Sequence, residues 1–207
     1  MKSQWGPTWL LSAADGVAKG RETLALVAGA QEVAIAHHSA RTLRYALAIA
    51  ELENERDVEP DLLFHACLLH DIGASSLPTG TQRFEVEGAD IAADTVVGHG
   101  YTQAQTEKVW QAVALHTSPH IAERMGSLTR LVRLGVRADF GDNLIDAELR
   151  RQTEADLPRL DVERVLSRVV VEACLVDPRR APAASWPNAL LAAHQTSSHP
   201  DARLTAF

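Results

Sequence analysis

The chain has 207 residues, of which 46% are hydrophobic and 23% charged. This length suits one substantial domain, and the composition is typical of a soluble globular protein. The formal net charge of −7 disfavours general nucleic-acid binding, because an acidic surface repels a phosphate backbone.

The N-terminal segment and the cysteines indicate the compartment. Residues 1–11 carry one lysine and an apolar stretch broken by Gly6 and Pro7, which fits neither a signal peptide nor a membrane span. Cys67 and Cys174 are too few for the disulfide framework of a secreted protein. We therefore expect a cytoplasmic protein with no membrane partner.

Aromatic residues make up only 5% of the chain, whereas alanine and leucine are abundant. This bias favours helices, because strands prefer branched and aromatic side chains. No segment alternates convincingly between apolar and polar residues. The sequence therefore predicts an all-α fold in which residues 1–207 form one domain.

Helical periodicity predicts the first clear helix over 33–52, which has no interior proline or glycine. Asp61 is expected to cap a second helix, which carries the run LLFHACLLHDI and stops at Gly73. A third helix is expected over 86–97.

Cap signals define the later helices. Thr102 and Gln105 resemble a capping box that opens a helix through His116. Ser127 is expected to cap the next helix, and the last clear helix covers 162–175.

Two breaker-rich segments, 73–80 and 178–187, divide the chain. The second separates the body from a C-terminal tail, which includes Trp186. We expect the tail and the N-terminal arm, with Trp5 and Trp9, to pack back over the body. Either could instead act as a lid or form the contact of a homodimer.

The most informative local feature is His70-Asp71, at the end of an apolar helix and just before Gly73. Burying these two side chains without partners would cost several kcal/mol. A divalent metal ion satisfies both, since imidazole nitrogen and carboxylate oxygen are normal ligands. The alternative is a buried His–Asp hydrogen bond without a metal, and an isolated dipeptide favours that alternative.

Two other helices favour the metal. On the helix over 33–52, His38 and Arg41 share one face with Tyr45. On the helix that follows Ser127, Asp139 lies on the apolar stripe. Three segments thus direct metal-compatible groups inward, and one ion would satisfy all of them.

The order of these groups, in the segments HHSAR, LLHDIG and RADFGD, resembles the HD-domain superfamily of metal-dependent phosphohydrolases and their relatives. The resemblance covers about residues 33–142 and implies a helical bundle, followed by a helical extension at about 155–207. It implies a metal site formed by four ligands: His38, His70, Asp71 and Asp139.

The segments RFEVEGAD, VW and ALHTS resemble the cyanamide-hydratase-like branch of this superfamily. That branch binds zinc and adds water to a small nitrile-type substrate. The resemblance therefore implies one divalent ion, with zinc expected and iron, manganese or nickel as alternatives. It also implies a hydratase or hydrolase, in the lyase or hydrolase class, that acts on a small molecule.

Water activation needs a proton acceptor near the metal. Glu85, His116 and Asp71 are the candidate catalytic residues, with Asp90 behind them. As an alternative, Glu85 pairs with Arg83 or Arg41 and has no catalytic role. His116 lies at a helix C-terminus, where an imidazolium is favoured without any catalysis.

We expect Arg41, Phe84 and Thr117 to contact the substrate, although Thr117 could simply cap its helix. A phosphohydrolase is the main alternative, and it would need cations to hold the phosphate. The sequence offers no dense basic run beside the motifs. The cations available to such an enzyme are Arg41, Arg44, Arg83 and Arg124.

A dinuclear iron oxygenase is a further alternative, in which His99 and His116 would bind a second metal. His65 is expected in the core or behind the ligands, and His194 and His199 are expected to be exposed. A non-catalytic regulatory HD module is the last alternative. All four ligand positions are filled, which argues against it.

Overall fold

The structure is a computed structural model that describes residues 5–196. Within that range ten α-helices and two short 3-10 helices are present, and no strand occurs. The predicted all-α fold is confirmed. The elements are α1 (Thr8–Asp15), α2 (Gly20–Ala30), α3 (Val33–Leu52), α4 (Pro60–Leu69), α5 (Phe84–Gly98), α6 (Gln103–Leu115), η1 (Ala122–Arg124), α7 (Ser127–Asp139), α8 (Ala147–Asp156), α9 (Val162–Val176), η2 (Pro178–Arg180) and α10 (Trp186–Thr196).

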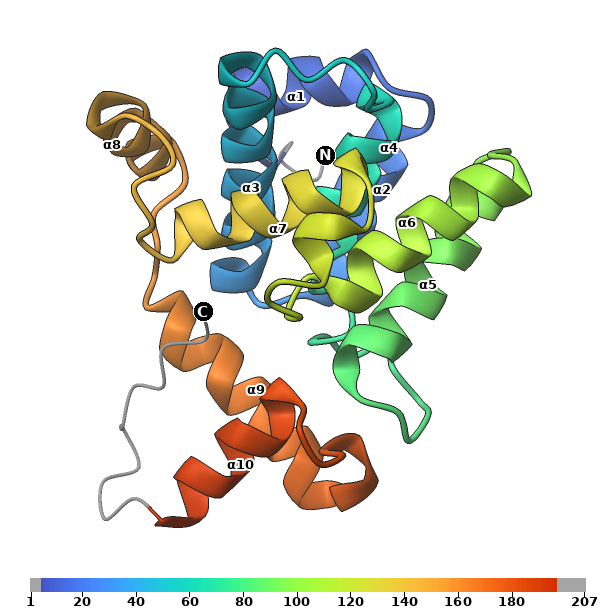
Figure 1. The fold of residues 1–207 in the computed structure, drawn as a ribbon, viewed down its shortest axis with the longest axis vertical. Helices are drawn as coiled ribbons and strands as arrows, with labels where there is room; N and C mark the ends of the chain where they lie inside the picture. The colour runs from blue at the N-terminus through green and yellow to red at the C-terminus, as the bar shows by residue number, and fades with distance from the viewer. Residues whose placement is uncertain (1–4, 197–207) are drawn as a thin grey trace.

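The long helix α3 forms the centre of the body, and α7 crosses it (Figure 1). Helix α4 packs against both, and α5 and α6 form an antiparallel pair beside α4. The main hydrophobic core lies between these helices, and α1 and α2 close it on the N-terminal side. This arrangement brings the ends of α3, α4, α6 and α7 towards one region.

The crossing of α3 and α7 depends on Gly135. A Cβ atom at Gly135 would lie 2.5 Å from the carbonyl oxygen of Thr42 and 3.1 Å from the Cβ of Ala46. Both of those residues belong to α3, so the two helix backbones approach more closely than a side chain would allow. The buried stripe predicted on α7 is confirmed, from Leu128 through Gly135 to Asp139.

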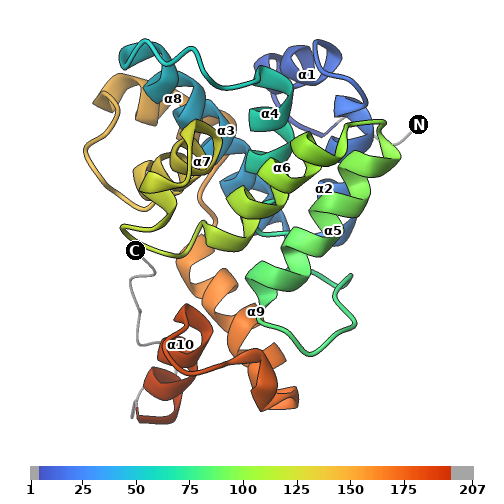
Figure 2. The same cartoon turned by 45° about the vertical axis from the view of Figure 1, so that its right-hand side comes forward.

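Helices α9 and α10 form a second, smaller cluster at one end of the molecule (Figure 2). Their apolar residues pack on Ile35 of α3, on Ala74 and on Phe84 of α5. Trp186 contributes directly, because its ring meets the ring of Phe84 edge-on with centroids 5.7 Å apart. The expectation that the tail packs back on the body is confirmed for the residues up to 196.

Two predicted caps are wrong. Helix α4 begins at Pro60 with Glu59 as its N-cap residue, so Asp61 lies in the first turn, because proline is preorganised for the first helical position. Helix α7 begins at Ser127 after Gly126, and the Ser127 hydroxyl donates to Glu55 instead of capping. The capping box of Thr102 and Gln105 is confirmed.

The N-terminal arm contains the helices α1 and α2, which the sequence analysis did not predict. Trp5 and Trp9 pack against the main core, as expected. No helix within residues 5–196 combines the length and the apolar character needed to cross a membrane.

A buried polar network joins α2, α4 and the loop after α5. The Nε2 atom of His65 donates to the carbonyl of Ala18, so its Nδ1 accepts from the Thr23 hydroxyl, at 2.9 Å. Tyr101 also lies 3.1 Å from Nε2. The network suits a neutral imidazole, and burial lowers the pKa of His65 to about 4. The expectation that His65 belongs to the core is confirmed.

We expect Gly135→Ala to lower the free energy of unfolding by about 1–3 kcal/mol, because the added methyl group forces α3 and α7 apart. Urea denaturation measures this change. Gly29→Ala is the matched control, since a Cβ at this exposed position on α2 meets nothing within 4 Å. The control should be neutral or stabilising by up to about 1 kcal/mol. Equal effects of the two variants would contradict the close helix crossing.

We also expect His65 to make stability depend on pH. Its folded pKa lies below the unfolded value of 6.5, so its contribution is complete above pH 6.5 and is lost as the pH falls towards 4. The loss amounts to about 3 kcal/mol. Denaturation between pH 7 and 4 should therefore show a shallower fall for His65→Gln than for the wild type. The exposed His194→Gln variant should keep the wild-type slope, and an unchanged slope in His65→Gln would refute the assignment.

Candidate metal centre

The His70-Asp71 pair lies where α4 ends. Leu69 is the last helical residue, His70 is the C-cap residue and Asp71 belongs to the following turn. Gly73 then passes directly under α5, since a Cβ there would lie 1.9 Å from the carbonyl oxygen of Phe84. The turn lets two adjacent residues point to one place, which they could not do inside a helix.

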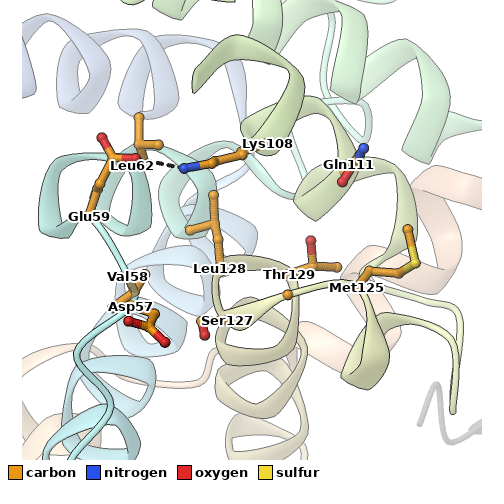
Figure 3. Close-up of a pocket in the computed structure, with 11 residues that line it drawn as sticks. Asp57, Val58, Glu59, Leu62, Lys108, Gln111, Met125, Ser127, Leu128 and Thr129 are labelled. Atoms are coloured by element: carbon orange, nitrogen blue, oxygen red, sulfur yellow. Dashed lines mark hydrogen bonds and ion pairs between the residues drawn. The ribbon is translucent and has the colours of Figure 1, made fainter. Parts of the chain in front are cut away.

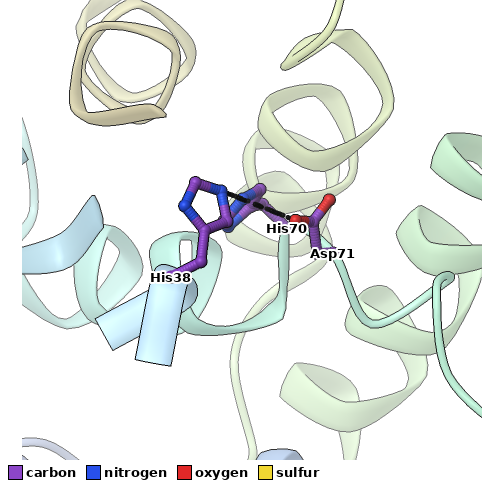
Figure 4. A group of neighbouring side chains, drawn as sticks. All are labelled: His38, His70 and Asp71. Carbon is purple, nitrogen blue, oxygen red and sulfur yellow. Dashed lines mark hydrogen bonds and ion pairs between the residues drawn. The ribbon is translucent and has the colours of Figure 1, made fainter. Parts of the chain in front are cut away.

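Three ligand atoms from two segments converge here (Figure 4). One nitrogen each of His38 and His70 and an oxygen of Asp71 lie within 4.8 Å of one another, and all three side chains are buried. The Nε2 atoms of His38 and His70 are 3.1 Å apart. They lie 3.6 Å and 3.3 Å from Oδ2 of Asp71. This is the one such group among the described residues.

The Nδ1 atoms of both imidazole rings, which point away from Asp71, already have hydrogen-bond partners. Nδ1 of His70 lies 2.7 Å from the carbonyl oxygen of Cys67, and Nδ1 of His38 lies 2.6 Å from Oδ2 of Asp139. A carbonyl or a carboxylate can only accept, so each Nδ1 carries the proton. The Nε2 atom of each ring is therefore the one that faces Asp71.

Asp71 is the anionic partner. It is 1% exposed, and neither carboxylate oxygen accepts a hydrogen bond from the described residues. Burial opposes its ionisation, but His70 and His116 hold the pKa of this carboxyl well below its usual value. Conversely, burial tends to lower the pKa of His70, and the charge of Asp71 raises it above the ordinary value. The imidazoles around Asp71 thus favour its ionised form.

A third imidazole approaches Asp71 from the other side. His116 is the C-cap residue of α6 and is 1% exposed. Its Nε2 atom lies 3.3 Å from Oδ1 of Asp71. Its Nδ1 atom lies 2.6 Å from the carbonyl oxygen of Val113. The two ring nitrogens of His116 thus face the same kinds of partner as those of His70.

Asp139 lies behind His38 instead of beside Asp71. Nε and Nη2 of Arg41 donate to its two oxygens at 2.6 and 2.7 Å. Burial raises the pKa of this carboxyl, but Arg41 and His38 outweigh burial and lower it far below the ordinary value. The direct ligation expected of Asp139 stays a prediction, because in this geometry the carboxylate reaches the centre through the imidazole of His38.

The substrate contact expected of Arg41 stays a prediction, and in this structure its side chain is engaged within the protein. It is fully buried, and its third nitrogen, Nη1, donates to the carbonyl oxygens of Leu157 and Pro158. The guanidinium therefore ties α3 to Asp139 and to the loop before α9. A buried carboxylate pairs well with a planar cation that can donate to both of its oxygens, and Arg41 does so with Asp139.

Glu85 pairs with Arg83, which was the alternative left open by the sequence. Arg83 donates to both of its carboxylate oxygens, and the hydroxyl of Thr117 donates to Oε1 at 2.7 Å. Thr117 is thus bonded to Glu85 and lies beside His116. The ring of Phe84 meets that of His116 edge-on, with centroids 5.7 Å apart.

Other predicted residues lie elsewhere. Asp90 is exposed and accepts from the indole of Trp110 at 2.8 Å, so it is not behind the catalytic candidates. His99 lies beside His65, with its Nε2 atom 3.9 Å from Glu22, and it is not among the grouped ligand atoms of the described residues. His194 is exposed as predicted. His199 lies outside the described residues.

Two cavities differ in their relation to the centre. A cavity of about 100 Å³ is lined by Gly73, Phe84, Cys174 and Arg180 among others, and Gly73 follows Asp71 by two residues. A larger hollow of about 340 Å³ lies at the opposite end of α4, where Lys108 pairs with Glu59 (Figure 3). None of the candidate ligands lines either cavity.

The HD domain family matches residues 35–162, which include His38, His70, Asp71, His116 and Asp139. No curated protein gives a significant match. HD domains bind divalent metals, and the family consists generally of metal-dependent hydrolases. Because the match covers more than half of the chain, this protein belongs to the HD domain family.

Proposed function

We propose that this protein is a hydratase or hydrolase that uses one divalent ion, held by His38, His70 and Asp71, to activate water. One observation carries the proposal: the Nε2 atoms of two imidazoles and an oxygen of a buried carboxylate lie within 4.8 Å of one another. Such a set is mutually repulsive unless a proton or a cation occupies it. The mixture of nitrogen and oxygen donors fits zinc, and iron, manganese and nickel bind the same donors.

When bound, a divalent ion supplies Lewis acidity and lowers the pKa of water at the site towards neutrality. The chain's own residues supply orientation and the proton acceptor. Cys67 and Asp139 fix the rings of His70 and His38 through their outer nitrogens. Asp71 has two oxygens, so one can bind the ion while the other accepts the proton of the attacking water.

The surroundings favour a small, uncharged substrate such as cyanamide or another nitrile. The cavity lined by Gly73 and Phe84 is only about 100 Å³, and most of the residues that line it are apolar. Two of the arginines available for a phosphate are engaged elsewhere, Arg41 with Asp139 and Arg83 with Glu85. Arg180 lines the cavity and donates to the carbonyl of Gly80, which leaves donors for one polar group of a substrate.

The first test is metal content. Purified protein should hold about one divalent ion per chain by inductively coupled plasma mass spectrometry. Asp71→Asn should lower zinc affinity at least 100-fold and abolish activity, because the charge that attracts the ion is gone. Asp90→Asn, an exposed carboxylate on α5, is the control and should retain both. Full metal content and activity in Asp71→Asn would refute the site.

Substrate assays test the reaction. Formation of urea from cyanamide without release of ammonia supports the hydratase. Phosphate release from a panel of deoxynucleotides would instead support the phosphohydrolase alternative. Two irons per chain with oxygen uptake would contradict both activities. A metal-free protein that is inactive in every assay would indicate a regulatory module.

A further inference from the structure

We propose that the larger hollow is a second binding site, which takes a small molecule with an apolar body and a single carboxylate head group. The hollow measures about 340 Å³, which lies within the range of small-molecule sites in proteins. It lies at the N-terminal ends of α4 and α7, whereas His70, Asp71 and Asp139 lie at or just beyond their C-terminal ends. The site is therefore separate from the metal centre and does not depend on the proposed function.

The first argument is the open N-terminus of α7. Its N-cap residue is Gly126, which has no side chain that could accept from the first turn. The N–H groups of Ser127, Leu128 and Thr129 donate to no acceptor within residues 5–196, and all three residues line the hollow. These three donors, together with the positive end of the helix dipole, favour an anionic oxygen at this point.

The second, independent argument is the side chain of Thr129. The residue is only 2% exposed, yet its hydroxyl has no hydrogen-bond partner in the described part of the chain. Thr153, which is buried to the same extent on α8, instead donates to the carbonyl oxygen of Leu149. Figure 3 shows the Thr129 hydroxyl directed away from α7, towards the side of the hollow where Lys108 and Gln111 lie. This hydroxyl is therefore a fourth donor for an occupant of the hollow.

Apolar side chains form the rest of the wall and account for the apolar body of the ligand. Leu62 and Leu128 belong to the main hydrophobic core, and they also line the hollow. Val58 and Met125 complete the apolar lining. Met125 is 43% exposed, so its flexible thioether is free to cover an apolar group that enters.

The charges around the hollow limit the head group to one negative charge. Lys108 and Glu59 pair at 2.9 Å, so their charges largely cancel. Asp57 also lines the hollow, and its carboxylate neither pairs with a cation nor accepts from the N–H groups of α7 within the described residues. Its charge repels a phosphate dianion more strongly than a carboxylate. An ammonium head is disfavoured because it cannot accept from the α7 donors.

A titration followed by amide proton–nitrogen correlation spectra tests the site in the full chain. The probe is hydrocinnamate, which joins a phenyl ring to one carboxylate. We expect the amide signals of Ser127, Leu128 and Thr129 to shift most, with a dissociation constant of about 1 mM or below. Hydrocinnamamide, its uncharged analogue, should bind about tenfold more weakly, because a charged acceptor makes stronger hydrogen bonds. Phenylpropylamine and inorganic phosphate should leave these signals unchanged.

Three variants test the assigned groups. Thr129→Val removes the hydroxyl and keeps the shape, so it should weaken hydrocinnamate binding about tenfold. Thr153→Val is the matched control, since it makes the same change at equal burial outside the hollow, and it should bind like the wild type. Asp57→Asn removes the opposing charge at an exposed position and should tighten binding about threefold at low salt.

The outcomes separate this site from the metal centre. Asp71→Asn should lose zinc and still bind hydrocinnamate with the same shifts, so a failure of the proposed function leaves this result unchanged. No shift at the start of α7, or shifts confined to the metal centre, would overturn the second site. Equal binding of hydrocinnamate and phenylpropylamine would overturn the carboxylate preference, and wild-type affinity in Thr129→Val would overturn the role of its hydroxyl.

Discussion

The centre is governed by one constraint: a carboxylate buried without hydrogen-bond donors must be neutralised. Asp71 meets this condition, with the Nε2 atoms of three histidines within 3.3 to 3.6 Å. Removing such a charge from water costs several kcal/mol unless a proton or a cation compensates it. Histidines of α3, of the end of α4 and of the end of α6 surround this carboxylate. Asp71 is therefore the residue around which the candidate site is built.

The buried ion pair of Arg41 and Asp139 orients His38, because Asp139 also contacts Nδ1 of that ring. Arg41 and Asp139 join α3 to α7, and Arg41 also bonds the carbonyls that precede α9. The pair can form because Gly135 lets α7 lie directly on α3. The orientation of the His38 ring is thus coupled to the packing of two helices, and a change in that crossing would reach the centre through Asp139.

The C-terminal helices add the wall of the adjacent cavity. Val170 and Cys174 of α9 line the cavity of about 100 Å³ together with Gly73 and Phe84. Phe84 contacts both Trp186 on α10 and His116 at the centre. The extension therefore shapes the space beside the candidate ligands, and its residues are suited to determine which small molecules fit.

The sequence by itself determined the fold class, the long helices and the polar groups that α3, α4 and α7 bury, because periodicity along one helix reveals which residues share its apolar face. It did not reveal α1, α2 or α8, whose signals are weak without their packing partners. Only the tertiary structure decided that Asp139 lies behind His38 and that His116 lies beside Asp71. Those positions depend on which ring nitrogen meets a carbonyl or a carboxylate of another segment, and no local pattern encodes that choice.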